Sequence, residues 1–231
     1  MLLVNELTKR FGNYWALRGA SFTIRSGEVL GLVGPNGSGK TTLLECLARL
    51  LPIDGGIVRP DEPLAPRSRR DALFYMPDGI LPWPDQTVGW TLRFSASLQG
   101  VLRADADEIA RALDLVALDR QRVGTLSKGQ RKRLLIALAL LTPQPMLLLD
   151  EPFDGLDLRQ MREVGPLLRR VAATGRALLL SIHQLHDAVR VCDRLVLLSD
   201  GRVLGEGTLD QLRARVGRPE ADVEEVFLAL T

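Results

Sequence analysis

The feature that most constrains this chain is the stretch GPNGSGKT at residues 34–41. It satisfies the pattern G-x-x-x-x-G-K-[ST], in which a glycine-rich loop presents its backbone amides to phosphate groups. Before it stands EVLGLVG (residues 28–34), which is apolar nearly throughout, as a strand covered on both faces would be. After it stands TTLLECLARLL (residues 41–51), which indicates a helix that ends before Pro52. This order predicts an α/β nucleotide-binding fold.

Each residue type in this loop suits phosphate binding. Its glycines permit unusual backbone angles and close approach, and the helix that follows points its positive end at the same place. Lys40 supplies a mobile charge for the β- and γ-phosphates, and Thr41 supplies a hydroxyl for Mg²⁺. An ordinary glycine-rich turn is the alternative, but it does not explain the lysine and threonine in this context. We therefore predict a nucleotide site formed by Gly34, Pro35, Asn36, Gly37, Ser38, Gly39, Lys40, Thr41 and Thr42.

Strand patterns occur at both ends of the chain, and a helical pattern lies between them. The expected strands are residues 19–25, 28–34, 72–76, 145–151 and 176–183, followed by a hairpin over 194–207 that turns at Asp200-Gly201. Residues 84–142 show no strand pattern and are predicted to form an inserted helical subdomain. This order fits a mostly parallel sheet with helices on both faces.

Local signals predict several helix boundaries. Asp105 and Glu108 have the spacing of a capping box. A further helix is expected over residues 157–173, with a kink or a break at the Gly-Pro pair 165–166. The tail at residues 220–231 predicts a last helix that packs Val226, Phe227 and Leu230.

Two adjacent carboxylates end the predicted strand in MLLLDEP (residues 146–152). At the carboxyl end of a parallel strand they would lie beside the ligand crevice. Asp150 is suited to hold Mg²⁺, and Glu151 is suited to polarise an attacking water. A solvated acidic turn would be the better interpretation of this pair alone, but beside a phosphate-binding loop it becomes the poorer one.

A second helix start has the features of an anion site. In LSKGQRKRLLIALALL (residues 126–141) Ser127 and Gln130 have capping-box spacing ahead of an apolar run. Capping alone does not explain Gly129, because glycine is less favourable than alanine in a helix by about 1 kcal/mol. A glycine there would expose the free amides of the helix start to an anion. The basic run 131–133 is interpreted as a solvated helix face, with nucleic-acid or membrane binding as the minority interpretation.

Composition excludes some classes of protein. The chain of 231 residues has 46% apolar and 25% charged residues, as ordinary soluble domains do. Its net charge of +2 argues against a general nucleic-acid-binding protein, and no nucleic-acid partner is expected. The N-terminus lacks the apolar run of a signal peptide, and the longest apolar runs fall short of the about 20 residues that span a bilayer. Cys46 and Cys192 are expected to be free thiols in a cytosolic protein.

Taken together, the motifs resemble those of the nucleotide-binding subunits of ABC transporters. LSKGQ matches the family signature LSGGQ at four of five positions, GPNGSGKT resembles the Walker A loop, and MLLLDE resembles the Walker B strand. FDGLD (residues 153–157) resembles the D-loop, and SIHQ contains a counterpart of the switch histidine, His183. Phe11 resembles the aromatic residue that stacks on adenine, with Tyr14 and Trp15 as alternatives. The resemblance covers essentially the whole chain, with the motifs in the family's order.

The resemblance implies one ABC ATPase domain over residues 1–231. Residues 1–83 and 143–231 would form a P-loop NTPase core with an N-terminal antiparallel β subdomain, and residues 84–142 would form the helical signature subdomain. It also implies the cofactors ATP and Mg²⁺ and a head-to-tail dimer, either a homodimer or a paired cassette. Each subunit would bind the ATP held by the other through Ser127, Gly129 and Gln130.

The implied function is ATP hydrolysis that powers a transporter, with Glu151, His183 and Lys40 as catalytic residues. The transmembrane permease subunits would be separate chains, and this subunit would be cytoplasmic and peripheral on the inner face of the cell membrane. A single cassette of this kind resembles exporter-type ATPases. The alternative is a soluble ABC-type ATPase in cluster assembly, ribosome function or DNA repair. The signature opposes a P-loop kinase, and the sequence shows no N-K-x-D motif of a GTPase.

Two positions depart from the family pattern. Lys128 replaces the first signature glycine and is expected to be a tolerated, ordinary first-turn residue. Asp78 stands where the family has the Q-loop glutamine, which contacts Mg²⁺ and the attacking water and faces the membrane subunit. We therefore expect Asp78 to be a metal ligand beside Thr41 and Asp150.

Overall fold

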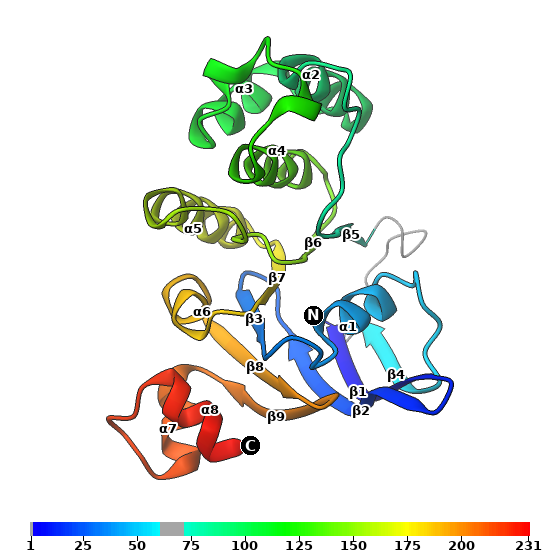
Figure 1. Ribbon diagram of the computed structural model, residues 1–231, viewed down its shortest axis with the longest axis vertical. Coiled ribbons are helices and arrows are strands. Elements are labelled where there is room, and N and C mark those ends of the chain that lie inside the picture. Colours follow the sequence, from blue (N-terminus) through cyan, green and yellow to red (C-terminus); the bar gives the residue numbers. More distant parts are fainter. Residues whose placement is uncertain (1, 61–71) are drawn as a thin grey trace.

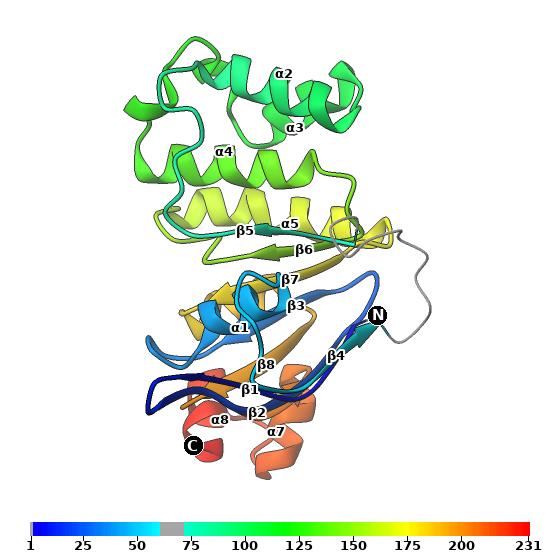
Figure 2. The ribbon, with the colours of Figure 1, turned by 90° about the vertical axis from the view of Figure 1, so that its right-hand side faces the viewer.

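The structure is a computed structural model that describes residues 2–60 and 72–231. A helical layer lies at one end of the molecule, two sheets lie below it, and the C-terminal helices lie at the opposite end (Figure 1). The turned view separates these layers from top to bottom (Figure 2). The α/β architecture with an inserted helical part agrees with the sequence prediction.

The central sheet has six strands in the order β5-β6-β7-β3-β8-β9. Their bounds are β3 Val29–Val33, β5 Leu73–Met76, β6 Met146–Leu149, β7 Ala177–Ile182, β8 Arg194–Ser199 and β9 Arg202–Gly207. Every neighbouring pair is parallel except β8 and β9, which form the predicted hairpin. Strands β3, β6 and β7 are buried along their whole length, which explains their continuous apolar sequences. Parallel strands end at one edge, so the segments that follow β3, β5, β6 and β7 meet there.

A second sheet, antiparallel, has three strands in the order β2-β1-β4. Their bounds are β1 Leu2–Phe11, β2 Tyr14–Ile24 and β4 Gly55–Pro60. This sheet is the predicted N-terminal antiparallel subdomain, paired in the register Val4 opposite Phe22. The turn of the β8–β9 hairpin joins it to the phosphate loop. The amide of Gly201 donates to the Ser38 carbonyl at 3.0 Å, and the Gly201 carbonyl accepts from the Arg18 amide at 2.7 Å.

Helices cover both faces of the central sheet. Their bounds are α1 Lys40–Leu47, α5 Leu158–Ala173, α6 Leu185–Val191, α7 Leu209–Val216 and α8 Val223–Leu230. Successive side chains of β7 point to opposite faces. Leu179 therefore packs into the cluster that contains α1 and the antiparallel sheet, whereas Leu178 and Leu180 pack into the cluster that contains α5.

The inserted helical layer consists of α2 Val88–Gln99, α3 Arg103–Ala112 and α4 Lys128–Leu140, with short 3₁₀ turns at Val116–Leu118 and Val123–Thr125. Helix α4 lies between α2 and α3 on one side and β5 on the other. This sandwiched place buries Lys132 and Arg133, which are 3% and 6% exposed. The interpretation of residues 131–133 as a solvated helix face is therefore wrong for these two residues. Arg133 is satisfied by the Leu113 carbonyl at 3.0 Å.

One capping-box prediction is also wrong, and a helix break that the sequence allowed is absent. Asp105 and Glu108 form no capping box, because the chain reverses at Gly100 and α3 already begins at Arg103 after Leu102. Helix α5 runs without a break through Pro166. Pro166 is on the exposed side of α5, so the carbonyl that loses its partner can bind water instead.

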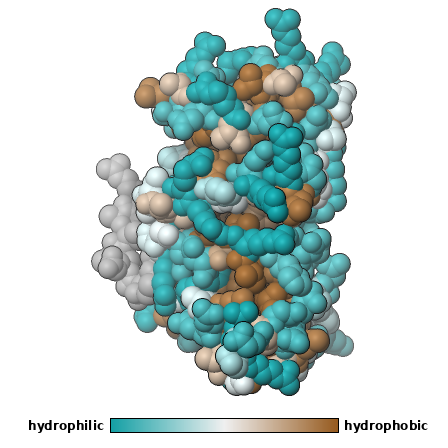
Figure 3. Space-filling view, turned by 90° about the vertical axis from the view of Figure 1, so that its left-hand side faces the viewer, coloured by the Kyte–Doolittle hydropathy of each residue, from teal (hydrophilic) through white to brown (hydrophobic). Residues whose placement is uncertain are grey.

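The last helix, α8, buries Val226 and partly buries Phe227 and Leu230, as predicted. Both cysteines are free thiols. The surface on the side of α5 and α6 is mostly hydrophilic, with apolar side chains visible in its hollows (Figure 3). Within residues 2–60 and 72–231, no helix is long and apolar enough to cross a membrane.

Candidate functional site

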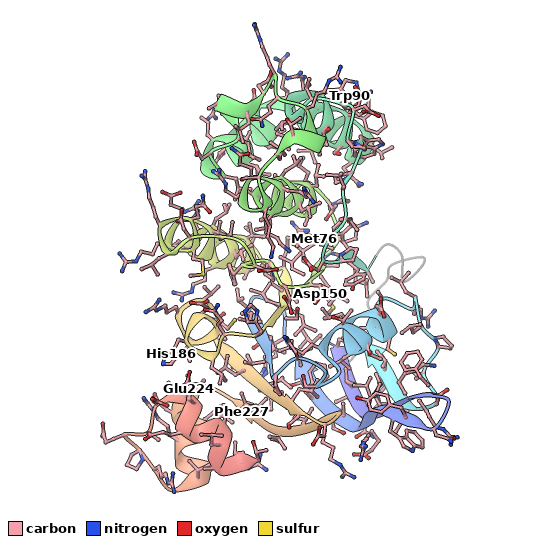
Figure 4. All side chains as sticks on the ribbon, in the orientation of Figure 1. Met76, Trp90, Asp150, His186, Glu224 and Phe227 are labelled. Atoms are coloured by element: carbon pink, nitrogen blue, oxygen red, sulfur yellow. The ribbon has the colours of Figure 1, made fainter. Side chains whose placement is uncertain are left out.

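Polar residues from four segments meet at the carboxyl edge of the central sheet. They are residues 34–39 after β3, Asp78 after β5, Asp150 and Glu151 after β6, and His183 after β7. The amide of Asp150 donates to the carbonyl of Met76, the last residue of β5, at 2.9 Å, and Figure 4 shows the two residues close together. The structure therefore gathers most of the predicted phosphate, metal and catalytic residues at one edge.

The phosphate loop depends on close backbone contacts that only glycine allows. A Cβ atom at Gly34 would lie 2.0 Å from the Leu198 carbonyl oxygen. One at Gly39, where φ is +104°, would lie 2.6 Å from the Ala16 carbonyl oxygen. The loop is thus held between the β8–β9 hairpin and β2. Helix α1 begins directly after Gly39 with no side-chain cap, which leaves its first amides for a ligand.

Lys40 folds back over this loop. Its Nζ atom donates to the carbonyl oxygens of Gly34 at 2.8 Å and Pro35 at 3.0 Å. Burial lowers the pKa of Lys40, while the charges of Glu151 and Asp150 oppose that shift. Lys40 thus lies between the phosphate loop and the two carboxylates after β6.

Asp150 is almost fully buried and is held by two hydroxyl groups. Ser181, on β7, donates its hydroxyl to Oδ1, and the Tyr75 hydroxyl lies 3.4 Å from Oδ2. Burial and the charge of Asp150 raise the pKa of Tyr75 well above its usual range. Sequence reasoning missed both hydroxyls as site residues. The available signal was their place in strands that end at the same edge as β6.

Glu151 has an unusual backbone conformation, with φ at +47°. A positive φ is costly for glutamate and is found mostly where the surrounding structure enforces it. Here the Glu151 amide donates to the Ser181 hydroxyl at 2.8 Å, which fixes the turn after β6. The Oε2 atom of Glu151 lies 3.8 Å from Nδ1 of His183. The predicted base and the predicted switch histidine are therefore neighbours.

A cavity of about 290 Å³ lies over the phosphate loop. It is lined by Phe11, Tyr14 and Glu151 together with residues of the loop and of the start of α1. Trp15 is not among its lining residues, and its ring lies 5.7 Å from the Arg10 guanidinium. Phe11 and Tyr14 are therefore both placed to meet a base, and Trp15 is not.

The signature residues do not line this cavity. Ser127 and Gln130 form the predicted capping box at the start of α4. The backbone amide of Gln130 donates to the Ser127 hydroxyl at 3.3 Å. Gly129 is buried, and a Cβ atom there would lie 2.7 Å from the Gly155 carbonyl oxygen. Close packing against the D-loop segment therefore accounts for this glycine, which is a reason that the sequence prediction did not include.

The two unusual residues, Lys128 and Asp78, are both paired. Lys128 binds Asp154 at 2.7 Å, so it is not an ordinary first-turn residue. Asp78 binds the buried Lys132 at 2.6 Å. Oxygen atoms of Asp78, Asp154 and Glu151 also lie within 4.8 Å of one another.

Residues 17–154 match the family described as ABC transporter. The chain belongs to the ABC transporter family. Two relatives that it resembles over most of its length are ATP-binding proteins of that family. It is 35% identical to Nod factor export ATP-binding protein I of Burkholderia lata, over 96% of this chain and 75% of that protein. It is 36% identical to daunorubicin resistance ATP-binding protein DrrA3 of Streptomyces coeruleorubidus, over 96% of this chain and 72% of that protein.

Solved structures agree with this assignment. A structure of an ATP-binding subunit of an ABC transporter matches with a TM-score of 0.87 and 29% identity, over 100% of this chain and 99% of that one. A bacterial Atm1-family ABC exporter with ATP bound matches with a TM-score of 0.81 and 25% identity, over 98% of this chain and 41% of that one. This ABC subunit is an ATPase whose ATP hydrolysis powers transport. A soluble ATPase unconnected to transport is not favoured.

Proposed function

We propose that the loop at residues 34–41 binds the phosphates of ATP and that Glu151 is the general base of its hydrolysis. The observation that carries the proposal is that the phosphate loop, the buried Asp150 and the strained Glu151 lie together at the carboxyl edge of the sheet. Glu151 would accept a proton from the attacking water. His183, beside Glu151, would orient that carboxylate and the γ-phosphate.

The residues present fit a Mg²⁺ ion beside the phosphates. Asp150 is a buried carboxylate at the loop, and Thr41 carries an exposed hydroxyl. The cavity over the phosphate loop is lined by Thr41 and Glu151 among others, so oxygen atoms of these side chains face the place of the phosphates. Oxygen ligands of this kind suit Mg²⁺, which would neutralise phosphate charge during hydrolysis. Thr41 and Asp150 would hold the ion, whereas Asp78, the third ligand expected from the sequence, is bound by Lys132.

The signature would complete the ATP site of a second subunit. Ser127 is exposed and does not line the cavity of its own subunit. A head-to-tail dimer would bring the Ser127 hydroxyl, the α4 start at Gly129 and the Gln130 side chain to the partner's γ-phosphate. Either a homodimer or a paired cassette satisfies this arrangement.

A separate membrane subunit would dock beside the segment that follows Asp78. Three exposed aromatic rings cluster there, with Trp83 5.9 Å from Trp90 and 5.4 Å from Phe94 between ring centroids. Trp90 and Phe94 stack at 4.8 Å on α2. Exposed apolar clusters of this kind mark contact surfaces. Figure 4 shows Trp90 at the outer side of the helical layer.

The relatives favour an exporter. Their names refer to Nod factor export and daunorubicin resistance, and this chain has the same cassette over most of their length. A subunit of this kind would work in the cytoplasm, held on the inner face of the cell membrane by its permease.

Mixing two inactive variants tests the shared site. Lys40→Ala removes the phosphate charge, and Ser127→Arg puts a bulky cation where a small hydroxyl meets the γ-phosphate. A head-to-tail mixed dimer has one site with both lesions and one site with neither, so mixing should recover part of the ATPase activity that each variant lacks alone. If Ser127 serves its own subunit, every site carries a lesion. Differently tagged chains that pair but recover no activity would therefore count against the proposal.

A further inference from the structure

The start of helix α4 carries two lysines that bind carboxylates of the core. Lys128 and Lys132 are four residues apart, so their side chains leave the same side of the helix. Nζ of Lys128 lies 2.7 Å from Oδ2 of Asp154, and Nζ of Lys132 lies 2.6 Å from Oδ1 of Asp78. Asp154 follows β6 and Asp78 follows β5. One helix is thus tied to two neighbouring strand ends.

The two aspartates crowd Glu151. Oxygen atoms of the three carboxylates lie within 4.8 Å of one another, a separation at which like charges repel. The lysines offset this repulsion. Burial alone would raise the pKa of Asp78, but the hydrogen bond and charge of Lys132 outweigh it and hold that pKa below its usual value. The hydrogen bond to Asp154 raises the pKa of Lys128.

The two ion pairs differ in burial. We call Lys132–Asp78 the inner pair and Lys128–Asp154 the outer pair. The Lys132 side chain is 4% exposed and that of Asp78 is 46% exposed, so it is the buried ammonium group that needs a partner, which Asp78 supplies. The Lys128 and Asp154 side chains are 65% and 27% exposed, and an open ion pair of this kind adds little stability. The inner pair therefore supports the fold, whereas the outer pair mainly sets where two segments lie.

Backbone contact reinforces the outer pair. A Cβ atom at Gly155 would lie 2.7 Å from Cγ of Lys128, and one at Gly129 would lie 2.7 Å from the Gly155 carbonyl oxygen. The signature helix and the D-loop segment therefore touch directly, with the Lys128 stem lying over Gly155. Lys128 and Asp78, the two departures from the family pattern, each have a partner of opposite charge.

We propose that Lys128 and Lys132 are positioning residues that clamp the signature helix to the D-loop and to Asp78 within one subunit. Through this clamp the signature, which serves the partner's ATP, moves together with the segment that follows Glu151. Asp78 then acts as the partner of Lys132 and not as a ligand of Mg²⁺. The inference builds on the proposed ATPase site, but its ion pairs can be tested without nucleotide, so either can fail alone.

Hydrogen–deuterium exchange of the full chain without nucleotide tests the outer pair. Lys128→Gln should raise amide exchange at residues 126–130 and 153–157 by about twofold to fivefold, the range that an exposed ion pair supports. Lys128→Arg should keep wild-type exchange, because its guanidinium can still bind Asp154. Reversing the pair, with Lys128→Asp and Asp154→Lys together, should recover most of the protection that either change loses alone.

Arg159→Gln is the matched control, because it breaks an exposed ion pair with Glu163 on the helix that follows the D-loop. It should leave exchange in both segments, kcat and KM unchanged. Lys128→Gln should lower kcat and leave KM for ATP unchanged, because the subunit's own loop binds ATP. Exchange in Lys128→Gln no different from that in Arg159→Gln, or no recovery in the reversed pair, overturns the outer half of the clamp.

Thermal unfolding and Mn²⁺ binding test the inner pair. Asp78→Asn leaves the buried Lys132 charge unpaired, so the unfolding midpoint should fall, and adding Lys132→Met should restore part of it. Binding of Mn²⁺ in the presence of ATP, followed by electron paramagnetic resonance, should be the same in Asp78→Asn and the wild type. A clear loss of Mn²⁺ affinity would assign Asp78 to the metal site. That result, or an unchanged midpoint, overturns the inner half of the clamp.

Discussion

Helices α1 and α4 both begin at glycine-bearing motifs, yet their first turns are satisfied differently. Helix α1 follows Gly39, which offers no side-chain cap, and the loop before it opens on a cavity. Helix α4 follows Ser127, which is capped by Gln130 in a reciprocal pair, and its Gly129 is covered by the D-loop. The first helix start has no side-chain cap, whereas the second has a capping box that pairs the backbone amides of Ser127 and Gln130 within its own chain.

The difference shows that a glycine near the start of a helix can belong to two kinds of surface: one that lines a cavity in its own subunit and one that does not. The α1 side brings phosphate loop, carboxylates and aromatic rings together in one subunit. The start of α4 does not line the cavity of its own subunit, so on the proposed dimer Ser127, Gly129 and Gln130 act only by meeting a site built by the other subunit. Variants on the α1 side should therefore impair nucleotide binding or chemistry, and variants on the α4 side should impair pairing.

Glu151→Gln should have the largest effect. The amide cannot accept the proton of the attacking water, so kcat should fall by about 10²–10⁴-fold while ATP binding persists. An ATP-bound dimer should then accumulate, which size-exclusion chromatography in ATP detects. Turnover close to that of the wild type would show that Glu151 is not the base.

A matched pair of glycine variants tests the comparison directly. Gly39→Ala forces a side chain onto a residue at φ +104° and against the Ala16 carbonyl, which should cost about 1–3 kcal/mol of unfolding free energy and abolish ATP binding. Gly129→Ala should keep ATP binding by the monomer and lose the ATP-dependent dimer. Fluorescent-nucleotide binding measures the affinity for ATP, and light scattering measures dimer formation. Equal loss of nucleotide binding in both variants would contradict the different roles given to the starts of α1 and α4.

Removing one of the aromatic rings that line the cavity should have a smaller effect. Phe11→Ala and Tyr14→Ala each remove a ring that lines the cavity, and each should weaken ATP binding by about 0.5–1.5 kcal/mol, the value of an aromatic contact. Trp15→Ala is the control, because Trp15 does not line the cavity. Titration with ATP at constant Mg²⁺ should rank the three, and a larger loss in Trp15→Ala would place adenine elsewhere.

Tyr75→Phe should have the smallest effect. It removes a long hydrogen bond to Asp150, with an expected loss of about 0.5 kcal/mol in stability, the low end for a hydrogen bond. Burial and the charge of Asp150 raise the pKa of Tyr75, so its contribution is complete below the unfolded value of about 10 and is lost as the pH rises through the higher folded value. Denaturant unfolding at neutral and alkaline pH checks both the size and the direction, and a stability gap that grows with pH would contradict this account.

Local sequence patterns predicted the nucleotide core well because its elements are set by short-range rules. Continuous apolar runs marked β3, β6 and β7, and the motif at residues 34–41 placed the phosphate loop between strand and helix. The Asp200-Gly201 turn was likewise predicted, and both residues have the positive φ that such a turn requires.

Contacts between distant segments were not predictable in the same way. Lys132 was interpreted as solvated because helical periodicity does not reveal that α4 is covered on both sides. Gly129 was explained by its amides alone, because the approach of Gly155 depends on tertiary packing. Ser181 escaped notice because its partner, Asp150, follows a neighbouring strand that is distant in the sequence.

The hairpin behind the phosphate loop has a consequence for biosynthesis. The loop forms early in the chain, but its backing is made late, by the Leu198 carbonyl against Gly34 and by the Gly201 amide on Ser38. Contacts so distant in sequence close slowly. A ribosome-bound chain that has not yet released the hairpin should therefore display an unsupported loop and an uncovered β3. For this subunit, the ability to hold nucleotide should emerge only after residues 198–201 have left the ribosome, and until then the exposed strand is a site where aggregation can begin.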